Sequence, residues 1–206
     1  MDVHRLPLPP LGANCYLLQN GARGLIIDPG GDAQTVVRAC ADLGLTPEAV
    51  LLTHGHFDHV GAVPELCRVY PLLPVYLHDL DAAGSDPQLF PLPVQLERAG
   101  YWDNLRSLEE ECLELTGFHI HVLHTPGHSQ GSCCFQLGEH LFTGDTLFRF
   151  SMGRTDFPGG SAEAMARSLK RLAALPGDYA IHPGHDAPTT LDFERHNNPY
   201  LRELGL

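Results

Sequence analysis

The part of the sequence that decides the fold is the stretch Leu51-Leu52-Thr53-His54-Gly55-His56-Phe57-Asp58-His59-Val60-Gly61. Three histidines and one aspartate fall within six positions here, directly after the short apolar run 49–52. Such a run predicts a buried strand, so the polar residues lie where a strand ends and a loop begins. His54 and His56 are two positions apart and therefore share one side of an extended chain. Asp58 and His59 instead introduce a helix, which we predict over 60–69.

Imidazole and carboxylate groups at this density are typical metal ligands. The two sets of residues are close together but aimed differently, and this predicts a site for two metal ions rather than one. The alternative interpretation is a surface loop that is merely rich in polar residues.

The composition restricts the classes of partner. The chain has 206 residues, 43% of them hydrophobic, and a net charge of -12. That charge argues against nucleic acid or an anionic membrane as a partner, because both require clustered Lys and Arg. No apolar run approaches the roughly 20 residues of a membrane span, and the N-terminus lacks the apolar core of a signal peptide. The composition leaves the oligomeric state open.

The six cysteines include no CxxC pair, and their spacing matches no disulfide framework. We therefore expect reduced, mostly buried thiols and a cytoplasmic location. Because no stretch has the composition of a linker, we also expect one domain spanning 1–206.

The predicted elements alternate between strands and helices. In the first half we predict strands at 3–8, 14–18, 24–27, 49–52 and 74–77, and helices at 33–43 and 60–69. In the second half we predict strands at 119–124, 133–137, 140–142 and 179–182, and helices at 161–175 and 193–204, the last interrupted near Pro199. This order predicts an α/β protein with mixed sheets flanked by helices.

Further ligand-type residues follow the later strands. His128, Asp145 and His185 come just after the strands at 119–124, 140–142 and 179–182 respectively, each next to a glycine. His182 lies three residues before His185 and has the same side chain. The Pro-Gly-His pattern favours His185 as the ligand, and we interpret His182 as structural.

Asp28 ends the predicted strand 24–27. It is either a turn-forming aspartate or a partner that orients a ligand imidazole from behind.

The pattern THxHxDH, followed by a later His, Asp and His, resembles the metallo-β-lactamase superfamily over nearly the whole chain. The resemblance implies a four-layer αβ/βα sandwich, in which two sheets pack face to face, helices lie outside and the site lies at one edge. It also implies that a first ion is held by His54, His56 and His128. A second ion is then held by Asp58, His59 and His185, and Asp145 bridges both. Zinc is the expected metal, and iron and manganese suit the same nitrogen and oxygen ligands.

Two divalent ions about 3.5–4 Å apart can share a water and lower its pKa to near 7. This would supply a metal-bound hydroxide at neutral pH, with Asp58 and Asp145 as the catalytic carboxylates that hold the pair. The two ions, the two aspartates and the hydroxide together leave the site slightly positive inside an acidic protein. We therefore expect a small, electron-rich acyl substrate rather than a large polyanion.

Within the superfamily, the sequence is most similar to the glyoxalase II group, which hydrolyses thioesters such as S-lactoylglutathione. The residues that carry this similarity are Thr53-His54-Gly55-His56-Phe57-Asp58-His59, Asp145-Thr146-Leu147-Phe148 and Gly153-Arg154. In larger members a basic residue near the position of Arg154 binds the glycine carboxylate of glutathione, and Arg149 is a second candidate. The alternative for both is a surface or capping arginine.

Only 21 residues follow His185. We therefore do not expect the C-terminal helical domain of the larger enzymes, and the sequence resembles their short single-domain type. Three further functions stay open: a lactonase or other esterase, a mononuclear-iron persulfide dioxygenase, and a non-enzymatic metal-binding module. The complete set of ligand residues argues against the last two.

Overall fold

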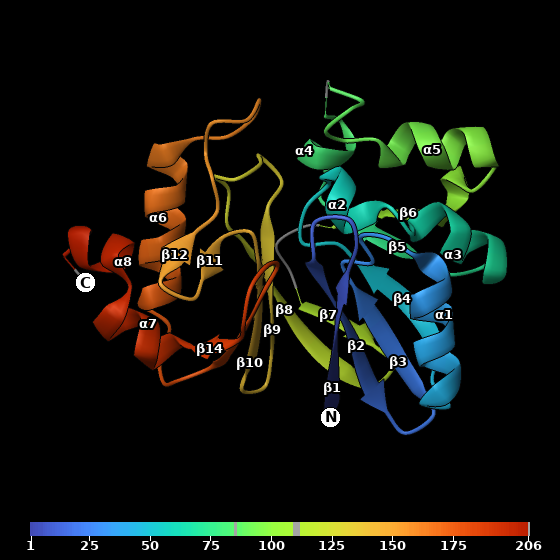
Figure 1. The fold of residues 1–206 in the computed structure, drawn as a ribbon, viewed down its shortest axis with the longest axis horizontal. Helices are drawn as coiled ribbons and strands as arrows, with labels where there is room; N and C mark the ends of the chain where they lie inside the picture. Colours follow the sequence, from blue (N-terminus) through green and yellow to red (C-terminus); the bar gives the residue numbers. More distant parts are fainter. Residues whose placement is uncertain (85, 109–111, 206) are drawn as a thin grey trace.

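Two six-stranded sheets pack face to face, and helices cover both outer surfaces (Figure 1). The structure is a computed structural model that describes residues 1–84, 86–108 and 112–205. The strand orders are β1-β2-β3-β4-β5-β6 in the first sheet and β14-β13-β10-β9-β8-β7 in the second. A small pair, β11 (Leu147–Phe148) and β12 (Ser151–Met152), lies apart from both sheets.

The first sheet contains β1 (Asp2–Leu8), β2 (Ala13–Asn20), β3 (Arg23–Ile27), β4 (Thr46–Leu51), β5 (Val75–Leu77) and β6 (Leu105–Ser107). The second contains β7 (Cys112–Leu115), β8 (Phe118–His124), β9 (Cys133–Leu137), β10 (His140–Gly144), β13 (Ala180–Pro183) and β14 (Thr189–Thr190). The strands predicted at 133–137 and 140–142 correspond to β9 and β10, which pair antiparallel.

Three layers of apolar side chains hold the sheets and helices together. The central layer lies between the two sheets and includes Tyr16, Phe135 and Phe142, all buried. One outer layer joins the first sheet to α1 (Ala33–Asp42), α3 (Val63–Val69) and α5 (Leu92–Ala99). The other joins the second sheet to α6 (Ala162–Ala173), α7 (Leu191–Asn197) and α8 (Pro199–Glu203). This confirms the four-layer αβ/βα sandwich. The single domain stays a prediction, which the shared central layer supports.

The predicted helix 60–69 is wrong in its bounds, because the structure has two helices there. The first, α2 (Phe57–Val60), includes Asp58, and the second, α3, begins at Val63. Pro64 lies in the first turn of α3, where its missing N–H group costs nothing. Two short helices therefore replace one long one. The break predicted near Pro199 is confirmed, because α7 ends before Asn198 and α8 begins after it.

The parallel strand pairs explain where the polar residues gather. β3 pairs with β4, and β10 pairs with β13, in parallel. The carboxyl ends of parallel neighbours lie at the same edge of a sheet, so the residues that follow them are brought together. Along the chain, α4 (Asp79–Ala82) follows β5, and the 3-10 helix Trp102–Asn104 comes directly before β6.

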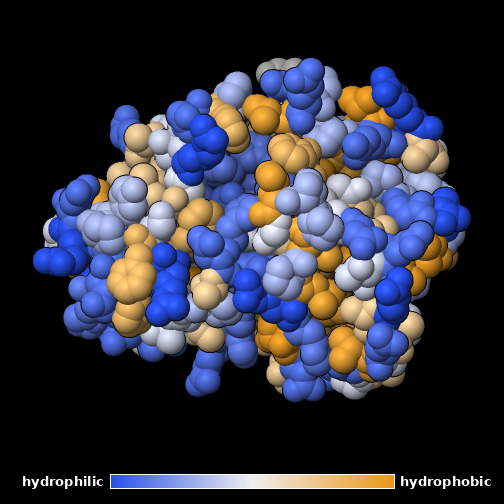
Figure 2. Space-filling view, in the orientation of Figure 1, coloured by the Kyte–Doolittle hydropathy of each residue, from blue (hydrophilic) through white to orange (hydrophobic). Residues whose placement is uncertain are grey.

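Hydrophilic residues predominate on the face shown in Figure 2, and hydrophobic residues lie between them in separate groups. No helix in the described part of the chain is long and apolar enough to cross a membrane.

Candidate metal centre

A first group of buried histidines combines residues from both halves of the chain. His54, His56 and His128 are each no more than 3% exposed, and each offers a ligand atom within 4.8 Å of the others. Nδ1 of His56 lies 2.8 Å from Nε2 of His128. Two ring nitrogens this close require a proton or a cation between them, so the group has the arrangement of a metal site.

A second group lies beside the first and contains Asp58, His59 and His185. Nε2 of His185 lies 3.3 Å from Oδ2 of Asp58 and 3.4 Å from Nε2 of His59. His59 is fully buried, whereas the side chain of His185 is 23% exposed. Because of this exposure, the second group lies nearer to solvent than the first.

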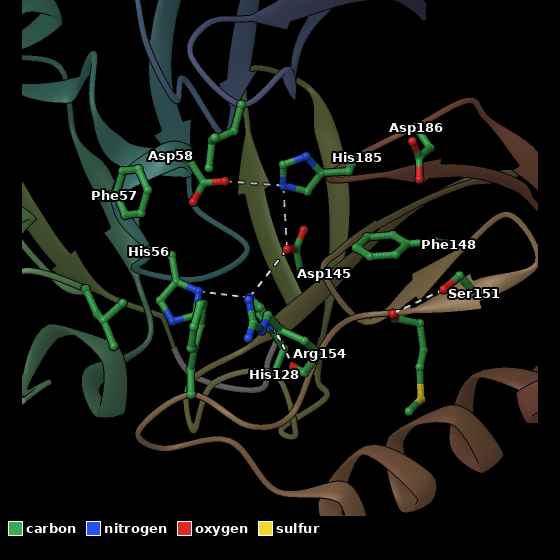
Figure 3. A pocket seen from close by; sticks show the side chains of 14 residues that line it. His56, Phe57, Asp58, His128, Asp145, Phe148, Ser151, Arg154, His185 and Asp186 are labelled. Carbon is green, nitrogen blue, oxygen red and sulfur yellow. Dashed lines mark hydrogen bonds and ion pairs between the residues drawn. The ribbon is translucent and has the colours of Figure 1, made fainter.

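Asp145 lies between the two groups (Figure 3). Its Oδ2 atom is 3.4 Å from Nε2 of His128 and 3.7 Å from Nε2 of His185, and its Oδ1 atom is 3.4 Å from Nε2 of His59. One carboxylate therefore faces imidazoles of both groups. This is the position that a bridging ligand requires.

Hydrogen bonds at Nδ1 decide which nitrogen of each ring is free. Nδ1 of His59 donates to Oδ2 of Asp28 at 3.0 Å, and Nδ1 of His128 donates to the carbonyl oxygen of Arg154 at 2.8 Å. The hydroxyl of Thr53 donates to Asp28 at 2.6 Å and so accepts from Nδ1 of His54 at 3.1 Å. In the neutral form of each of these three rings, which is the form that binds a metal, Nε2 is therefore the unprotonated nitrogen. Asp28 thus lies where the orienting role expected for it requires.

The polar atoms in this centre fit metal ions. Nε2 of His54 and Oδ1 of Asp145 are buried and have no hydrogen-bond partner among the described residues. Buried polar atoms of this kind are costly unless something satisfies them. Imidazole nitrogens and carboxylate oxygens are ligands that Zn, Fe and Mn accept. The residues present therefore fit a pair of divalent ions.

Burial and neighbouring charges set the protonation of these groups. Burial lowers the pKa of His54 well below its usual range and that of His56 to about 4, so both are neutral near pH 7. Burial opposes the charged form of His59 too, but the carboxylates of Asp145 and Asp28 outweigh it and raise its pKa to about 9. Burial likewise opposes ionisation of Asp58, yet His185 and His59 lower its pKa to about 2. The carboxylate of Asp58 is therefore ionised and available as a ligand.

Asp81 is a buried residue that the sequence analysis missed. Its carboxylate accepts from the backbone N–H groups of Gly55 and Gly131 at 2.9 and 2.7 Å, and from the hydroxyl of Ser129 at 2.7 Å. It thus joins the loop that carries His54 and His56 to the loop after His128. Burial raises its pKa in spite of these hydrogen bonds. The sequence gives no signal for this role, because the three partners are far from Asp81 along the chain.

The loop that carries His185 is held by the first sheet. The side-chain amide of Asn14 and the hydroxyl of Tyr16 both donate to the carbonyl oxygen of Pro183, at 2.9 and 2.7 Å. The backbone N–H of Asn14 donates to the carbonyl oxygen of Gly184 at 2.7 Å. Strand β2 therefore fixes the place of a residue about 170 positions later in the chain.

We expect Gly184→Ala to weaken metal binding. A Cβ at this position would lie 2.2 Å from Oδ1 of Asp145 and 2.8 Å from the ring of His59, so the carboxylate would have to move. A displacement of about 1 Å costs on the order of 100-fold in activity. Metal content per chain and kcat/KM measure this. Gly138→Ala is the control for general destabilisation, because its φ of 57° strains an alanine although a Cβ there meets no atom within 4 Å. This variant should keep its metal and its activity, and an equal loss of both in the two variants would contradict the explanation.

A cavity of about 500 Å³ opens onto the centre. Its lining combines His56, Asp58, His128, Asp145 and His185 with the apolar side chains of Leu11, Phe57, Leu89, Phe148, Met152 and Phe157, and with the polar side chains of Ser151, Arg154 and Asp186. The two arginines proposed for substrate binding differ in position. Arg154 lines the cavity, whereas the guanidinium of Arg149 lies 5.7 Å from the ring centre of Phe150. Arg149 is not one of the described residues that line this cavity.

His182 lies outside the centre, as its structural interpretation requires. Its ring stacks on Phe142, and its Nε2 atom lies 2.9 Å from Nδ1 of His140. Burial, followed by the nearby His140, lowers its pKa to about 4.

The lowered pKa of His182 predicts a loss of stability in acid. Between pH 6.5, the usual histidine value, and about 4, the unfolded chain binds a proton that the folded chain does not. The free energy of unfolding should therefore fall by about 1–2 kcal/mol as the pH drops through this window. Urea denaturation at pH 7 and pH 5 measures it. His182→Gln should have a smaller difference between the two pH values, and an unchanged difference would contradict the assignment.

Comparison with known proteins agrees with this geometry. The family model of the metallo-beta-lactamase superfamily matches residues 8–185. The chain belongs to the metallo-β-lactamase superfamily. Among curated relatives, "Hydroxyacylglutathione hydrolase GloC" of Haemophilus influenzae is 36% identical over 216 residues, which cover 98% of each chain.

Two solved structures resemble the chain closely. "BLEG-1 B3 metallo-beta-lactamase" has a TM-score of 0.85 and 36% identity, covering 97% of this chain and 99% of the other. "TTHA1623 in a di-iron-bound form" has a TM-score of 0.81 and 42% identity, covering 97% and 100%. The superfamily assignment makes the protein a metal-dependent hydrolase by class. We expect this chemistry at the two adjoining groups of candidate metal ligands.

Proposed function

We propose that this metallo-β-lactamase superfamily protein is a two-metal hydrolase of small thioesters such as S-lactoylglutathione. The proposal rests on the position of Asp145 between two complete groups of candidate metal ligands. Two divalent ions bound there would supply a water of lowered pKa and a Lewis acid for the acyl oxygen. The named relative GloC, at 36% identity, supports the thioester class.

The residues of the chain itself hold and orient the reacting groups. Asp28, Thr53 and the carbonyl oxygen of Arg154 keep three imidazoles in the correct tautomer. The apolar side chains of Phe148 and Met152 provide a wall for an uncharged part of the substrate. A thiolate leaves without being protonated, so hydrolysis of a thioester does not require the centre to supply a general acid.

Recognition of glutathione as the thiol part of the substrate would depend on Arg154, and this arginine is already paired. Its Nε atom and one terminal nitrogen donate to the two oxygens of Asp156, both at 2.7 Å. The guanidinium also lies 3.9 Å from the ring centre of Phe157. A glutathione carboxylate would have to compete with Asp156 for this arginine. Thioesters with other thiols are therefore reasonable substrates.

Zinc is the metal that we propose, with iron as the main competitor. The 42% identical neighbour was solved in a form described as di-iron-bound, so the same fold accepts iron. The complete second group, Asp58, His59 and His185, favours two ions over the single iron of a persulfide dioxygenase. We also propose a cytoplasmic location and a small-molecule substrate. The six cysteines, all within the described residues, form no disulfide, which is consistent with a reducing compartment.

A panel of substrates tests the proposal. S-lactoylglutathione, an acyl-coenzyme A, an acyl lactone and a β-lactam should be compared by kcat/KM, with metal content measured on the same sample. We expect the thioesters to exceed the lactone and the β-lactam by about 100-fold or more, a difference of about 2.7 kcal/mol in transition-state stabilisation. Turnover of the lactone or the β-lactam alone would overturn it. A single iron per chain would favour the dioxygenase.

A further inference from the structure

A second cluster of ligand-type side chains lies on the edge of the second sheet and shares no residue with the centre described above. Cys112 and Glu114 are on β7, the last strand in the order of that sheet, and His119 and His121 are on β8. The antiparallel register places Cys112 opposite His121 and Glu114 opposite His119. Residues that face each other in this way point to the same side of the sheet.

The cluster points outward, away from the core. Along β8 the buried residues Phe118, Ile120 and Val122 alternate with His119 and His121, and the first three belong to the central apolar layer. Strand pleating therefore turns both histidines to the outer surface. The four side chains form a two-by-two array that solvent can reach.

The side-chain contacts within the array bring the ligand atoms together. Sγ of Cys112 lies 2.9 Å from Nδ1 of His121, and the ring centres of His119 and His121 are 4.6 Å apart. Cys112, His119 and His121 each offer a ligand atom within 4.8 Å of the other two. In a tetrahedral zinc site the ligand atoms are about 3.3–3.8 Å apart, since Zn–N is about 2.0 Å and Zn–S about 2.3 Å. Small rotations of exposed side chains reach that spacing.

Glu114 contributes in another way, because its carboxylate contacts Nδ1 of His119. Carboxylates commonly orient a ligand imidazole by accepting from the nitrogen that does not bind the metal. The acidic character of the whole chain, with a net charge of -12, also favours a cation at the surface.

We propose that Cys112, His119 and His121 form a second, surface site for a thiophilic divalent ion of the zinc class, with Glu114 as the carboxylate that orients His119. One thiolate and two imidazoles are a ligand set that suits Zn²⁺. The site differs chemically from the buried centre, whose candidate ligands are all nitrogen and oxygen atoms. Sulfur is therefore the spectroscopic marker that separates the two.

Cobalt substitution tests the site in the intact protein with its buried centre already loaded. Added Co²⁺ should produce a near-ultraviolet thiolate-to-cobalt charge-transfer band. Of the six cysteines only Cys112 is exposed, and burial raises the pKa of four others, those of Cys15, Cys40, Cys67 and Cys134. The band should vanish in Cys112→Ser and weaken in His121→Gln. It should persist in His196→Gln, a matched exposed histidine on α7. Absence of the band in the unsubstituted protein would overturn the proposal.

Thiol reactivity gives a second measurement that is independent of cobalt. Cys112 should react quickly with an aromatic disulfide reagent, and added Zn²⁺ should slow that reaction by about tenfold or more. Protection should be lost in His119→Gln and His121→Gln, although the thiol remains. Hydrolysis by Cys112→Ser should match that of the unsubstituted protein, so failure of this site and failure of the proposed hydrolase are distinguishable. Equal reactivity with and without Zn²⁺ would show that Cys112 and His121 share only a hydrogen bond.

Discussion

Asp145→Asn should reduce hydrolysis by about a thousand-fold or more, the scale of losing a charge-stabilising group in an active site. The carboxylate faces His59, His128 and His185 at 3.4 to 3.7 Å, so the change removes negative charge from both groups at once. The amide keeps the volume of the carboxylate, and the fold should therefore survive. kcat/KM and metal content per chain measure the effect, and metal content should fall with activity.

Asp58→Ala is the informative comparison for Asp145. Its carboxylate contacts only the second group, through His185 and His59. We expect this variant to lose hydrolysis while it stays folded and keeps one ion. Asp192→Asn, an exposed aspartate on α7, should behave like the unsubstituted protein. If Asp145→Asn retained full activity and both ions, the bridging role would be refuted.

Asp28→Asn should weaken the binding of the second ion, although Asp28 is not one of the residues that would hold that ion. The carboxylate accepts from Nδ1 of His59 and from both the backbone N–H and the hydroxyl of Thr53. An amide cannot accept all three, and losing an orienting partner of this kind costs about 10–100-fold in metal affinity. One buried donor left unsatisfied should also lower the free energy of unfolding by about 1–3 kcal/mol.

Asparagine is the appropriate substitution at position 28 because Asp28 has a φ of 50°. Asn tolerates this left-handed conformation, so backbone strain does not confuse the result. Activity measured over a range of added metal concentrations distinguishes the Asp28 variant from the Asp145 variant. Asp28→Asn should recover most of its activity at high metal concentration, whereas Asp145→Asn should not. Activity that is insensitive to metal in Asp28→Asn would contradict the positioning role.

The candidate site was largely predictable because its residues follow apolar runs. His54, His128, Asp145 and His185 all come just after segments whose hydrophobicity predicts a buried strand, and the parallel pairs then bring their ends together. Asp28 was predictable for the same reason. The family resemblance assigned these residues to two ions, and the structure places them in two adjoining groups.

Asp81 and the split of the helix at 57–69 were not predicted, for different physical reasons. Asp81 satisfies donors on two loops that are 26 to 50 residues away, and no local pattern encodes how loops pack. Pro64 carried part of the signal for the split, because proline is favoured in the first turn of a helix. Proline also occurs inside helices that are kinked, so Pro64 alone did not show that a new helix begins there. Hydrophobic periodicity alone did not distinguish the two cases.

The attachment of His185 to β2 has a consequence for how the protein unfolds. Each group of ligand candidates draws residues from the first and the second sheet, so an ion bound there acts as a cross-link between the two halves of the molecule. Neither sheet can then separate without releasing metal, and resistance to heat becomes a function of the free metal concentration. At 100 times the dissociation constant, one ion adds about 2.7 kcal/mol to the free energy of unfolding. A chelator therefore acts on this molecule as a mild denaturant as well as an inhibitor.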